Sequence, residues 1–538
     1  MKTFKIFSMA AVALCLAACS NNDDYSVQMP TQSADVLHFE AAVAAPNADA
    51  TMRTVYEVDG TNIKVAWKDG DKIAAIVTNS EGKYAKTELT VSKVNTDDGS
   101  ATISGDITKP KDGELKVDLI YPASIVTLTD EDTKYSISFD KMSNGTLDGT
   151  LESIADNIDY RMADDCALTV SGDKATLTSA AKLESKLSIW KLTLQDKDGN
   201  ALSASKVTIV SSGGVAVASA TLATAGSTAY LPVPAATGDI CISATTADND
   251  YFYMKEGVTL AAKKYYRSTL KMTKGAHLAF LSADYEAKDG AILTGTLASN
   301  VKISIANNAT VTLKDANING SGTWTDAYHA GITCEGDATI NLEGTNTVKG
   351  FINTYPGIHV PEGKTLIING PGSLKASTGG THGSGIGGIH WGSCGNIKIT
   401  GGTITAEGGA AAAAIGSGNA SSCGDITITG GNVTAIGNIN NDYRGVGIGC
   451  GDGGGADTNR AKCGNITISG GTVTAIGKNG GVGIGSGWSG DCGTITITSG
   501  VTSVTATKGS GATNSIGAGD GGTCGTVSIA AGANVTQN

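Results

Sequence analysis

The C-terminal part of the chain repeats one short pattern, and this pattern is the strongest constraint on the fold. Its mark is an Ile-Gly pair followed by a Cys-Gly pair, whose cysteine stands eight residues after the isoleucine, or fifteen in the third copy. The isoleucines are Ile386, Ile415, Ile448, Ile484 and Ile516, and the cysteines are Cys394, Cys423, Cys463, Cys492 and Cys524. A repeat of about 30 residues that joins short β runs through glycines predicts the stacked coils of a parallel β-helix.

The residues between these marks agree with that prediction. Apolar and polar residues alternate after each Cys-Gly pair, as in Ile397 and Ile399, and in three copies a second run such as Ile404 follows a Gly-Gly pair. The alternation places Ile and Val inside the coil, while glycine permits the positive φ of tight corners. A single coil cannot bury its apolar side, so the coils must stack, and each buried Ile or Val then contributes ~1.5–3 kcal/mol.

Length and composition set further limits. A chain of 538 residues implies more than one domain, and its 73 glycines and 5% aromatic residues suit stacked coils with many turns. The net charge is -12, and no basic stripe is present to neutralise phosphates. Nucleic acid is therefore not expected as a partner.

The first residues have the features of an export signal. A basic leader precedes an apolar stretch that ends in Leu16-Ala17-Ala18-Cys19, and this ending resembles a bacterial lipobox. The resemblance implies that residues 1–18 are a signal peptide and that Cys19 is lipidated. The acidic linker, residues 19–32, is similar to the export signal of Bacteroidetes lipoproteins. It implies lipid anchoring at the cell surface, on the outer membrane.

Residues 33–275 carry a different pattern, with short alternating runs separated by Asp-Gly turns. Examples are the run from Leu37 to Val43 and the run from Ile73 to Val77. This pattern predicts antiparallel β-sandwiches. The polar stretch Met142–Asp165 suggests a boundary between two of them, at residues 33–155 and 156–275. The expected fold is therefore all-β, with two tandem antiparallel β-sandwich domains followed by a parallel β-helix over residues 276–538.

Two motifs in the sandwich region resemble those of fimbrillins, the type V pilus proteins of Bacteroidetes. They are Met52-Arg53-Thr54 with the run Val65–Ile73, and the run Val258–Tyr266. The resemblance implies a lipidated protein that is trimmed at Arg53 and joins other fimbrillin-like subunits in a fimbria by strand exchange. Because a long β-helix follows the second sandwich, donation of a terminal strand is not expected here. A role at the tip, or as a surface stalk, fits better.

The β-helix itself resembles carbohydrate-binding domains of bacterial surface proteins through the segment Gly357–Ile368. Fold likeness alone does not establish sugar binding. The cysteines should lie one rung of ~4.8 Å apart and point the same way, which opposes a tetrahedral metal site. We therefore expect a buried column of free thiols and no metal site formed by them.

A row of polar and aromatic residues forms the candidate ligand surface. It lies four residues after each register isoleucine, flanked by glycines, and is expected on an exposed corner where stacking aligns it into a strip. The candidate ligand-binding residues are His390, Trp391, Asn419, Asp452, Trp488 and Asp520. Aromatic faces beside amide and carboxylate groups suit a polysaccharide or host glycan. Trp324, Tyr328, His329 and Tyr443 lie nearby in the repeat. The alternative is that these are ordinary loop residues.

The residue pattern gives little support for catalysis. A polysaccharide lyase would need a basic residue beside acids, and Arg444, Arg460 and Lys462 lie near Asp442, Asp452 and Asp457. No carboxylate pair recurs at a spacing that would serve glycoside hydrolysis. No catalytic residue and no cofactor are expected, although calcium is compatible with the turns around Asp452 and Asp520. The hypotheses are an adhesin, a lyase and a structural pilus subunit.

Overall fold

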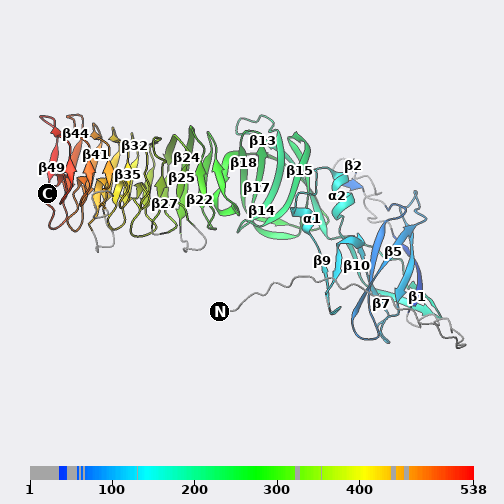
Figure 1. The fold of residues 1–538 in the computed structure, drawn as a ribbon. Helices are drawn as coiled ribbons and strands as arrows, with labels where there is room; N and C mark the ends of the chain where they lie inside the picture. Colours follow the sequence, from blue (N-terminus) through cyan, green and yellow to red (C-terminus); the bar gives the residue numbers. More distant parts are fainter. Residues whose placement is uncertain are drawn as a thin grey trace, which may run out of the picture.

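The computed structural model describes residues 36–44, 57–59, 62–64, 67–129, 131–320, 328–352, 354–437, 444–453 and 460–538. The expected signal peptide, Cys19 and Arg53 lie outside these ranges. Over the described ranges the protein is all-β and elongated, with its sheets arranged in series and the C-terminus at the end away from β1 (Figure 1). Of the helices within these ranges, none has the length and apolar character needed to cross a bilayer.

The first sheet has the strand order β11-β1-β6-β5-β4-β7-β10-β12. Its strands are β1 (Val36–Val43), β4 (Lys72–Thr78), β5 (Tyr84–Ser92), β6 (Ala101–Thr108), β7 (Lys116–Tyr121), β10 (Arg161–Ser171), β11 (Lys174–Leu177) and β12 (Glu184–Ser185). Strand β10 pairs with both β7 and β11, so the sheet closes on itself. The sequence predicted an antiparallel sandwich, whereas the β1–β11 pair is parallel. The sheet also takes strands from both sides of residue 155 and therefore crosses the predicted domain boundary.

The Trp67–Asp71 part of the fimbrillin-like motif has a structural role in this sheet. Trp67 is buried, its Nε1 donates to the carbonyl of Ala44 at 3.1 Å, and its ring meets Tyr121 edge to face at 5.4 Å. The Tyr121 hydroxyl donates to Asp71 at 3.2 Å. Gly70 has φ +92°, which favours glycine at this turn. These contacts fix the turn before β4 against the core.

The next unit contains two sheets that share one core. Strand β13 (Leu187–Gln195) lies between β16 (Thr228–Pro234) and β19 (Tyr265–Lys271). Strand β14 (Ala204–Ser211) pairs with β15 (Ala216–Gly226) and β17 (Ala236–Thr246), which pairs with β18 (Asp250–Leu260). Leu192 and Leu231 of the smaller sheet pack with Val207 and Ile242 of the larger one, all fully buried.

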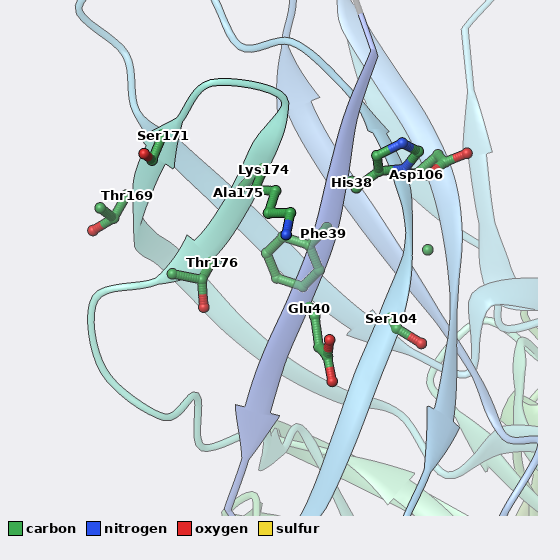
Figure 2. A pocket seen from close by; sticks show the side chains of 11 residues that line it. His38, Phe39, Glu40, Ser104, Asp106, Thr169, Ser171, Lys174, Ala175 and Thr176 are labelled. Atoms are coloured by element: carbon green, nitrogen blue, oxygen red, sulfur yellow. Dashed lines mark hydrogen bonds and ion pairs between the residues drawn. The ribbon is translucent and has the colours of Figure 1, made fainter.

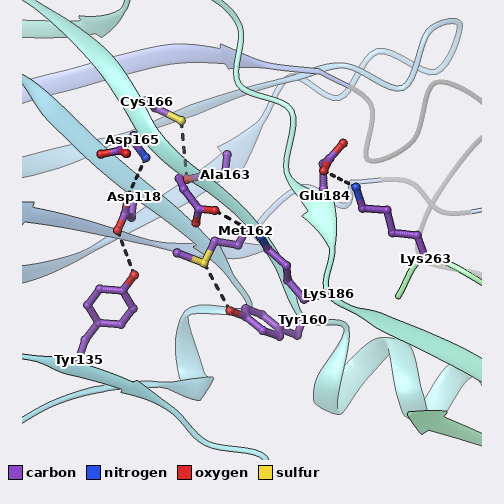
Figure 3. A network of polar contacts seen from close by, with 11 residues as sticks. Asp118, Tyr135, Tyr160, Met162, Ala163, Asp165, Cys166, Glu184, Lys186 and Lys263 are labelled. Atoms are coloured by element: carbon purple, nitrogen blue, oxygen red, sulfur yellow. Dashed lines mark hydrogen bonds and ion pairs between the residues drawn. The ribbon is translucent and has the colours of Figure 1, made fainter. Parts of the chain in front are cut away.

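Polar contacts join the first sheet to this unit. The short elements of the N-terminal half are β2 (Glu57–Asp59), β3 (Asn62–Lys64), η1 (Ala123–Ile125), β8 (Val126–Leu128), β9 (Tyr135–Ile137), α1 (Asp140–Ser143) and α2 (Leu151–Ile158). Figure 3 shows the polar network beside them, in which Tyr135 donates to Asp118 at 3.0 Å and Lys186 pairs with Asp164 at 3.3 Å. Lys263 pairs with Glu184 of β12 and so ties the β18–β19 turn to the first sheet.

The β-helix grows directly out of the second unit. Strand β20 (Thr273–His277) pairs antiparallel with β18 and parallel with β22 (Ile292–Thr296), so one sheet runs across the predicted boundary at residue 275. Gly275 has φ +115°, and a Cβ there would lie 2.1 Å from the carbonyl oxygen of Ile292. Only glycine fits at this switch from antiparallel to parallel pairing. A continuous hydrogen-bonded sheet therefore connects the β-helix to the second unit.

Within the described residues, the coils are held by parallel strand ladders. One ladder contains β21 (Tyr285–Ala287), β23 (Ile303–Ile305), β25 (Ile332–Cys334), β28 (Ile358–His359), β31 (Ile386–Gly387), β34 (Ala413–Gly416), β38 (Val446–Cys450), β42 (Ile484–Ser486) and β46 (Ile516–Gly517). The five register isoleucines lie on its last five strands. The cysteine ladder is β35 (Ser422–Cys423), β39 (Lys462–Cys463), β43 (Asp491–Cys492) and β47 (Thr523–Cys524).

The other two ladders carry the alternating runs. One contains β26 (Ala338–Glu343), β29 (Thr365–Asn369), β32 (Asn396–Ile399), β36 (Ile426–Ile428), β40 (Ile466–Ile468), β44 (Ile495–Ile497) and β48 (Val527–Ile529). The second contains β27 (Thr345–Lys349), β30 (Ser373–Ser377), β33 (Thr403–Glu407), β37 (Asn432–Ile436), β41 (Thr472–Ile476), β45 (Ser503–Thr507) and β49 (Val535–Gln537). Strand β24 (Ala309–Asn319) pairs with the first strands of both. The predicted parallel β-helix is confirmed.

The Ile-Gly pair has a clear physical reason. The register isoleucines are buried, and the glycines that follow them have φ between +129° and +138°. A Cβ on Gly449 would lie 1.9 Å from the carbonyl oxygen of Gly485 in the next coil, and the same clash recurs at Gly416 and Gly485. The turn after each register isoleucine thus requires glycine both for its backbone conformation and for the close approach of the coils.

The cysteines form the expected column of free thiols. Cys423, Cys463, Cys492 and Cys524 stand in direct register, and none is in a disulfide. A hydrogen bond that the Cys423 thiol donates to Cys394, together with burial, raises the pKa of Cys423 well above its usual value. Thiols in this state are poor nucleophiles and act as small apolar groups.

Candidate functional site

The predicted row of residues is one stacked corner of the β-helix. The N–H after each row member donates to the carbonyl of the next row member, one coil further on. These bonds run from Trp391 to Asn419 (3.1 Å), from Ala420 to Asp452 (2.8 Å), from Gly453 to Trp488 (2.7 Å) and from Ser489 to Asp520 (2.9 Å). Successive row members are therefore spaced by one rung of ~4.8 Å. We call this surface, formed by His390, Trp391, Asn419, Asp452, Trp488 and Asp520, the corner strip.

Trp391 is the most unusual residue of the corner strip. Its side chain is 74% exposed, and its backbone has φ +57°. This left-handed conformation costs a residue with a Cβ about 1 kcal/mol and is rare for a bulky side chain. The equivalent positions in the following coils hold the small residues Ala420, Gly453, Ser489 and Gly521. The first of these coils thus displays a large indole where the others have almost no side chain.

A groove of about 480 Å³ lies beside Trp391. Its lining comes from four segments of the chain and consists of Tyr328, Thr354, Tyr355, His382, Ile389, His390 and Trp391. The ring of His390 lies 4.1 Å from that of Trp391 and 4.7 Å from that of His382, measured between centroids. Tyr328, which also lines the groove, is 54% exposed. The groove is therefore walled mainly by aromatic rings.

The two histidines of the groove are held in their neutral form. Burial lowers the pKa of His382, and burial together with the His382 ring lowers the pKa of His390. The Nδ1 atom of His390 is buried and has no hydrogen-bond partner among the described residues. The groove therefore offers a ligand the ring of a neutral imidazole beside an exposed indole.

Asp452 corrects the prediction that the whole row is exposed. Its side chain is buried, with 6% exposure, and its Oδ1 accepts the backbone N–H of Trp488 at 2.9 Å. Asn419 donates through Nδ2 to the Asp452 carbonyl at 3.0 Å and is half-buried. Asp520 is exposed. The inner members of the strip therefore position its backbone, and the aromatic members provide the accessible surface.

Burial also raises the pKa of Asp452 to about 7. The folded protein then holds a proton that the unfolded chain releases near its ordinary value of 3.8. The free energy of unfolding should fall as pH rises through this window, by at most about 1.4 kcal/mol per pH unit, and level off above it. Asp452→Asn should remove this part of the pH dependence, because an amide does not titrate. The amide oxygen can still accept the Trp488 N–H, so the local structure should be kept.

Chemical denaturation at several pH values from about 4 to 8 measures this effect. The difference between Asp452→Asn and the parent isolates the one carboxyl from other titrating groups. Asp520→Asn, at an exposed row position, serves as the control and should follow the parent. Identical slopes for Asp452→Asn and the parent would contradict the assigned burial.

Of the residues considered for a lyase, those that the structure describes are not assembled as a catalytic group. Arg460 donates to Asp491 through Nε and Nη2 at 2.6–3.0 Å, which occupies its guanidinium in an ion pair. Arg444 lies instead over the ring of Trp488, 5.4 Å from its centroid. Lys462 is exposed on β39. Asp442 and Asp457, like Trp324 and Tyr443, lie outside the described residues.

Metal binding finds no support at these turns. Within the described ranges, no group of three or more histidine, cysteine, aspartate or glutamate residues is placed to hold a metal ion. The carboxyl of Asp452, one of the two considered for calcium, accepts a backbone N–H inside the fold. His329, suggested near the strip, packs on Phe351 at 4.1 Å between ring centroids.

A second hollow, of about 490 Å³, lies on the first sheet (Figure 2). It is located where β1 and β11 pair through only two residue pairs, His38 with Lys174 and Phe39 with Ala175. His38 pairs with Asp106 at 2.5 Å, but both side chains are more than half exposed. Such a surface pair contributes little to stability and does not form a preorganised site.

Comparisons with known proteins agree with the β-helix. A model of the β-helix repeat family matches residues 397–419, 426–452 and 466–488, which begin on β32, β36 and β40. No curated protein shows a significant match. The chain is similar to solved Bacteroides structures described as cell adhesion or fimbrial proteins.

Three of these structures cover less than half of this chain. A candidate cell adhesion protein from Bacteroides uniformis ATCC 8492 has 16% identity and a TM-score of 0.25, and the match covers 45% of this chain and 94% of that chain. A second candidate cell adhesion protein, from Bacteroides ovatus ATCC 8483, has 14% identity and a TM-score of 0.27, and the match covers 46% of this chain and 97% of that chain. A fimbrial protein from the same strain has 13% identity and a TM-score of 0.22, and the match covers 44% of this chain and 48% of that chain.

Proposed function

We propose that this protein is a cell-surface adhesin whose β-helix binds polysaccharide or host glycan along the corner strip. The observation that carries the proposal is Trp391, which combines 74% exposure with a left-handed backbone. Exposed indole and a strained backbone both cost stability, and small residues stand at the equivalent positions of the next coils. A role in ligand binding explains why this coil keeps a tryptophan.

The chemistry of the strip suits a sugar chain better than a compact ligand. Trp391 and Trp488 lie three rungs apart, or about 14 Å along the axis, with Asn419 and Asp452 between them. An indole face stacks on the apolar face of a sugar ring, and neighbouring oxygens and amides bond its hydroxyls. A linear polymer can occupy both rings at once, so that each contributes to the affinity.

The architecture suits display of such a strip away from a membrane. The β-helix continues the sheet of the second unit through β20, so it extends as a stiff rod (Figure 1). We extend the proposal to a lipid anchor at Cys19 on the outer face of the outer membrane, which rests on the resemblance of Leu16–Cys19 to a lipobox. The rod would then hold the strip clear of the cell surface.

A structural pilus subunit remains the second candidate, because of β1. This strand pairs with β6 along its whole length and buries Leu37, Phe39, Ala41 and Val43. Cleavage at Arg53 would free β1 from the chain and leave an apolar groove for another strand. Trimmed protein that forms ladders of larger assemblies would support this candidate, and trimmed protein that stays monomeric would count against it.

The adhesin proposal is tested by retention of the purified protein in gels that contain a panel of plant and host polysaccharides. Ultraviolet absorbance of the same mixtures reports the unsaturated product of a lyase. Saturable retention without new absorbance is the expected result. New absorbance would replace the adhesin by a lyase, and absence of retention on every polymer would refute glycan binding.

A further inference from the structure

The far end of the corner strip carries Arg444, a cation that forms no ion pair with the residues that the structure describes. The guanidinium of Arg444 lies over the ring of Trp488, and the side chain of Arg444 runs alongside Gly480, where a Cβ would meet it at 3.4 Å. Gly480 has φ +86°, a left-handed conformation that favours glycine at this turn. Stacking on the ring restricts the plane of the Arg444 guanidinium.

Arg444 differs in one respect from its neighbour Arg460. Arg460 pairs with Asp491 at 2.6 Å and also donates to the Gly521 carbonyl at 3.2 Å. Arg444 has no ion pair with any residue in the described ranges, and its buried Nη1 has no acceptor there. A donor without an acceptor is unfavourable, so an oxygen placed within its reach would be bound favourably.

The acid that interacts with Arg444, Asp452, is engaged inside the fold. Its Oδ1 accepts the Trp488 N–H, and burial raises its pKa to about 7 although the charge of Arg444 acts to lower it. Lys478 lies on the next coil, where its backbone pairs with Gly445 through two hydrogen bonds of 2.9 and 3.1 Å. Arg444 is therefore the cation that the structure places on the indole of Trp488.

We infer that the Arg444–Trp488 end of the corner strip recognises an anionic group on the glycan, a carboxylate or a sulfate, and so selects acidic over neutral polysaccharides. This specificity rests on the proposed glycan-binding function. The sugar ring lies against the indole, and two N–H groups of Arg444 donate to two oxygens of its acidic substituent. The rest of the strip, including Trp391, contributes sugar stacking that does not depend on charge.

The test compares the whole protein's affinity for polygalacturonate, dextran sulfate and neutral dextran. We expect the parent to prefer one of the two acidic polymers over dextran by at least about tenfold, and Arg444→Gln to remove that preference. The carboxylate polymer and the sulfate polymer distinguish the two possible acidic groups. Arg444→Lys keeps the charge but loses the planar fork, and should retain part of the preference.

Lys462→Gln is the matched control, because it removes the same charge from an exposed position on β39. It should change affinity less than about twofold. Equal losses in Arg444→Gln and Lys462→Gln would indicate general charge attraction and overturn the inference. Equal affinity of the parent for neutral and acidic polymers would also overturn the inference. If Trp391→Ala then lost this binding, the adhesin proposal would stay intact. Binding that survives Trp391→Ala and Trp488→Ala together would refute both.

Discussion

Gly449→Ala is expected to disrupt the β-helix, with a loss of roughly 4 kcal/mol or more in the free energy of unfolding. A Cβ at this position would lie 1.9 Å from the carbonyl oxygen of Gly485 and 2.9 Å from its carbon. These are backbone atoms of the adjacent coil, so no side-chain rotation can relieve the contact. The φ of +137° adds a conformational cost for alanine. Circular dichroism and limited proteolysis of the purified variant measure the damage.

Gly363→Ala provides the control for backbone strain without a clash. Gly363 has φ +73°, and a Cβ built there meets no atom within 4 Å. Its substitution should cost only about 1 kcal/mol. If Gly449→Ala were no more destabilising than Gly363→Ala, the close stacking of the coils at the Ile-Gly turns would be wrong.

Trp391→Gly is expected to weaken polysaccharide binding by roughly 30-fold or more while making the fold more stable by about 1 kcal/mol. Glycine accepts φ +57° without strain, and the exposed indole contributes little burial to the folded state. Loss of the ring removes the largest stacking surface of the strip. Affinity from a binding titration and stability from chemical denaturation should therefore move in opposite directions.

Ala420→Gly is the matched substitution one coil further along. Ala420 has the same backbone role, with φ +47°, but presents only a methyl group. Ala420→Gly should show the change in stability that comes from relieving the left-handed backbone, without a loss of affinity for polysaccharide. A Trp391→Gly variant that binds as the parent does would remove Trp391 from the ligand surface.

Much of the β-helix follows from local sequence. The spacing of Ile386, Ile415 and Ile448 predicts their register, because each coil must place its apolar residue over the previous one. The same repeat predicts glycines at positive φ and the alignment of Cys423 with Cys463. These features depend on neighbours one coil away, for which the repeat itself supplies the alignment.

The N-terminal units could be predicted less completely. The parallel pairing of β1 with β11 joins His38 to Lys174, residues far apart in the chain, and no local pattern specifies it. Helix α2 differs from the expectation of an all-β fold, in which no helix was predicted. Thr150 caps this helix by accepting the N–H of Ser153 at 3.1 Å, and its face from Ile154 to Ile158 is buried. The cap and the three-to-four spacing were the available signals.

The site shows the same division between what a repeat can specify and what it cannot. The row and its alignment were predicted, but the burial of Asp452 and the stacking of Arg444 on Trp488 were not. Both depend on how the enlarged third coil packs against the fourth, where the repeat is interrupted. Cys450 likewise lies outside the regular spacing, yet its thiol meets the cysteine column near Cys463.

The most direct test of glycan binding at the corner strip is oxidative footprinting of the protein with and without a polysaccharide that retains it. Mass spectrometry then reports the oxidation of each residue. Trp391 and Trp488 should be protected by the bound polymer, whereas Phe139, which is 40% exposed on the N-terminal part, should be oxidised to the same extent in both samples. Saturated binding without protection of either tryptophan would place the ligand elsewhere and contradict the account.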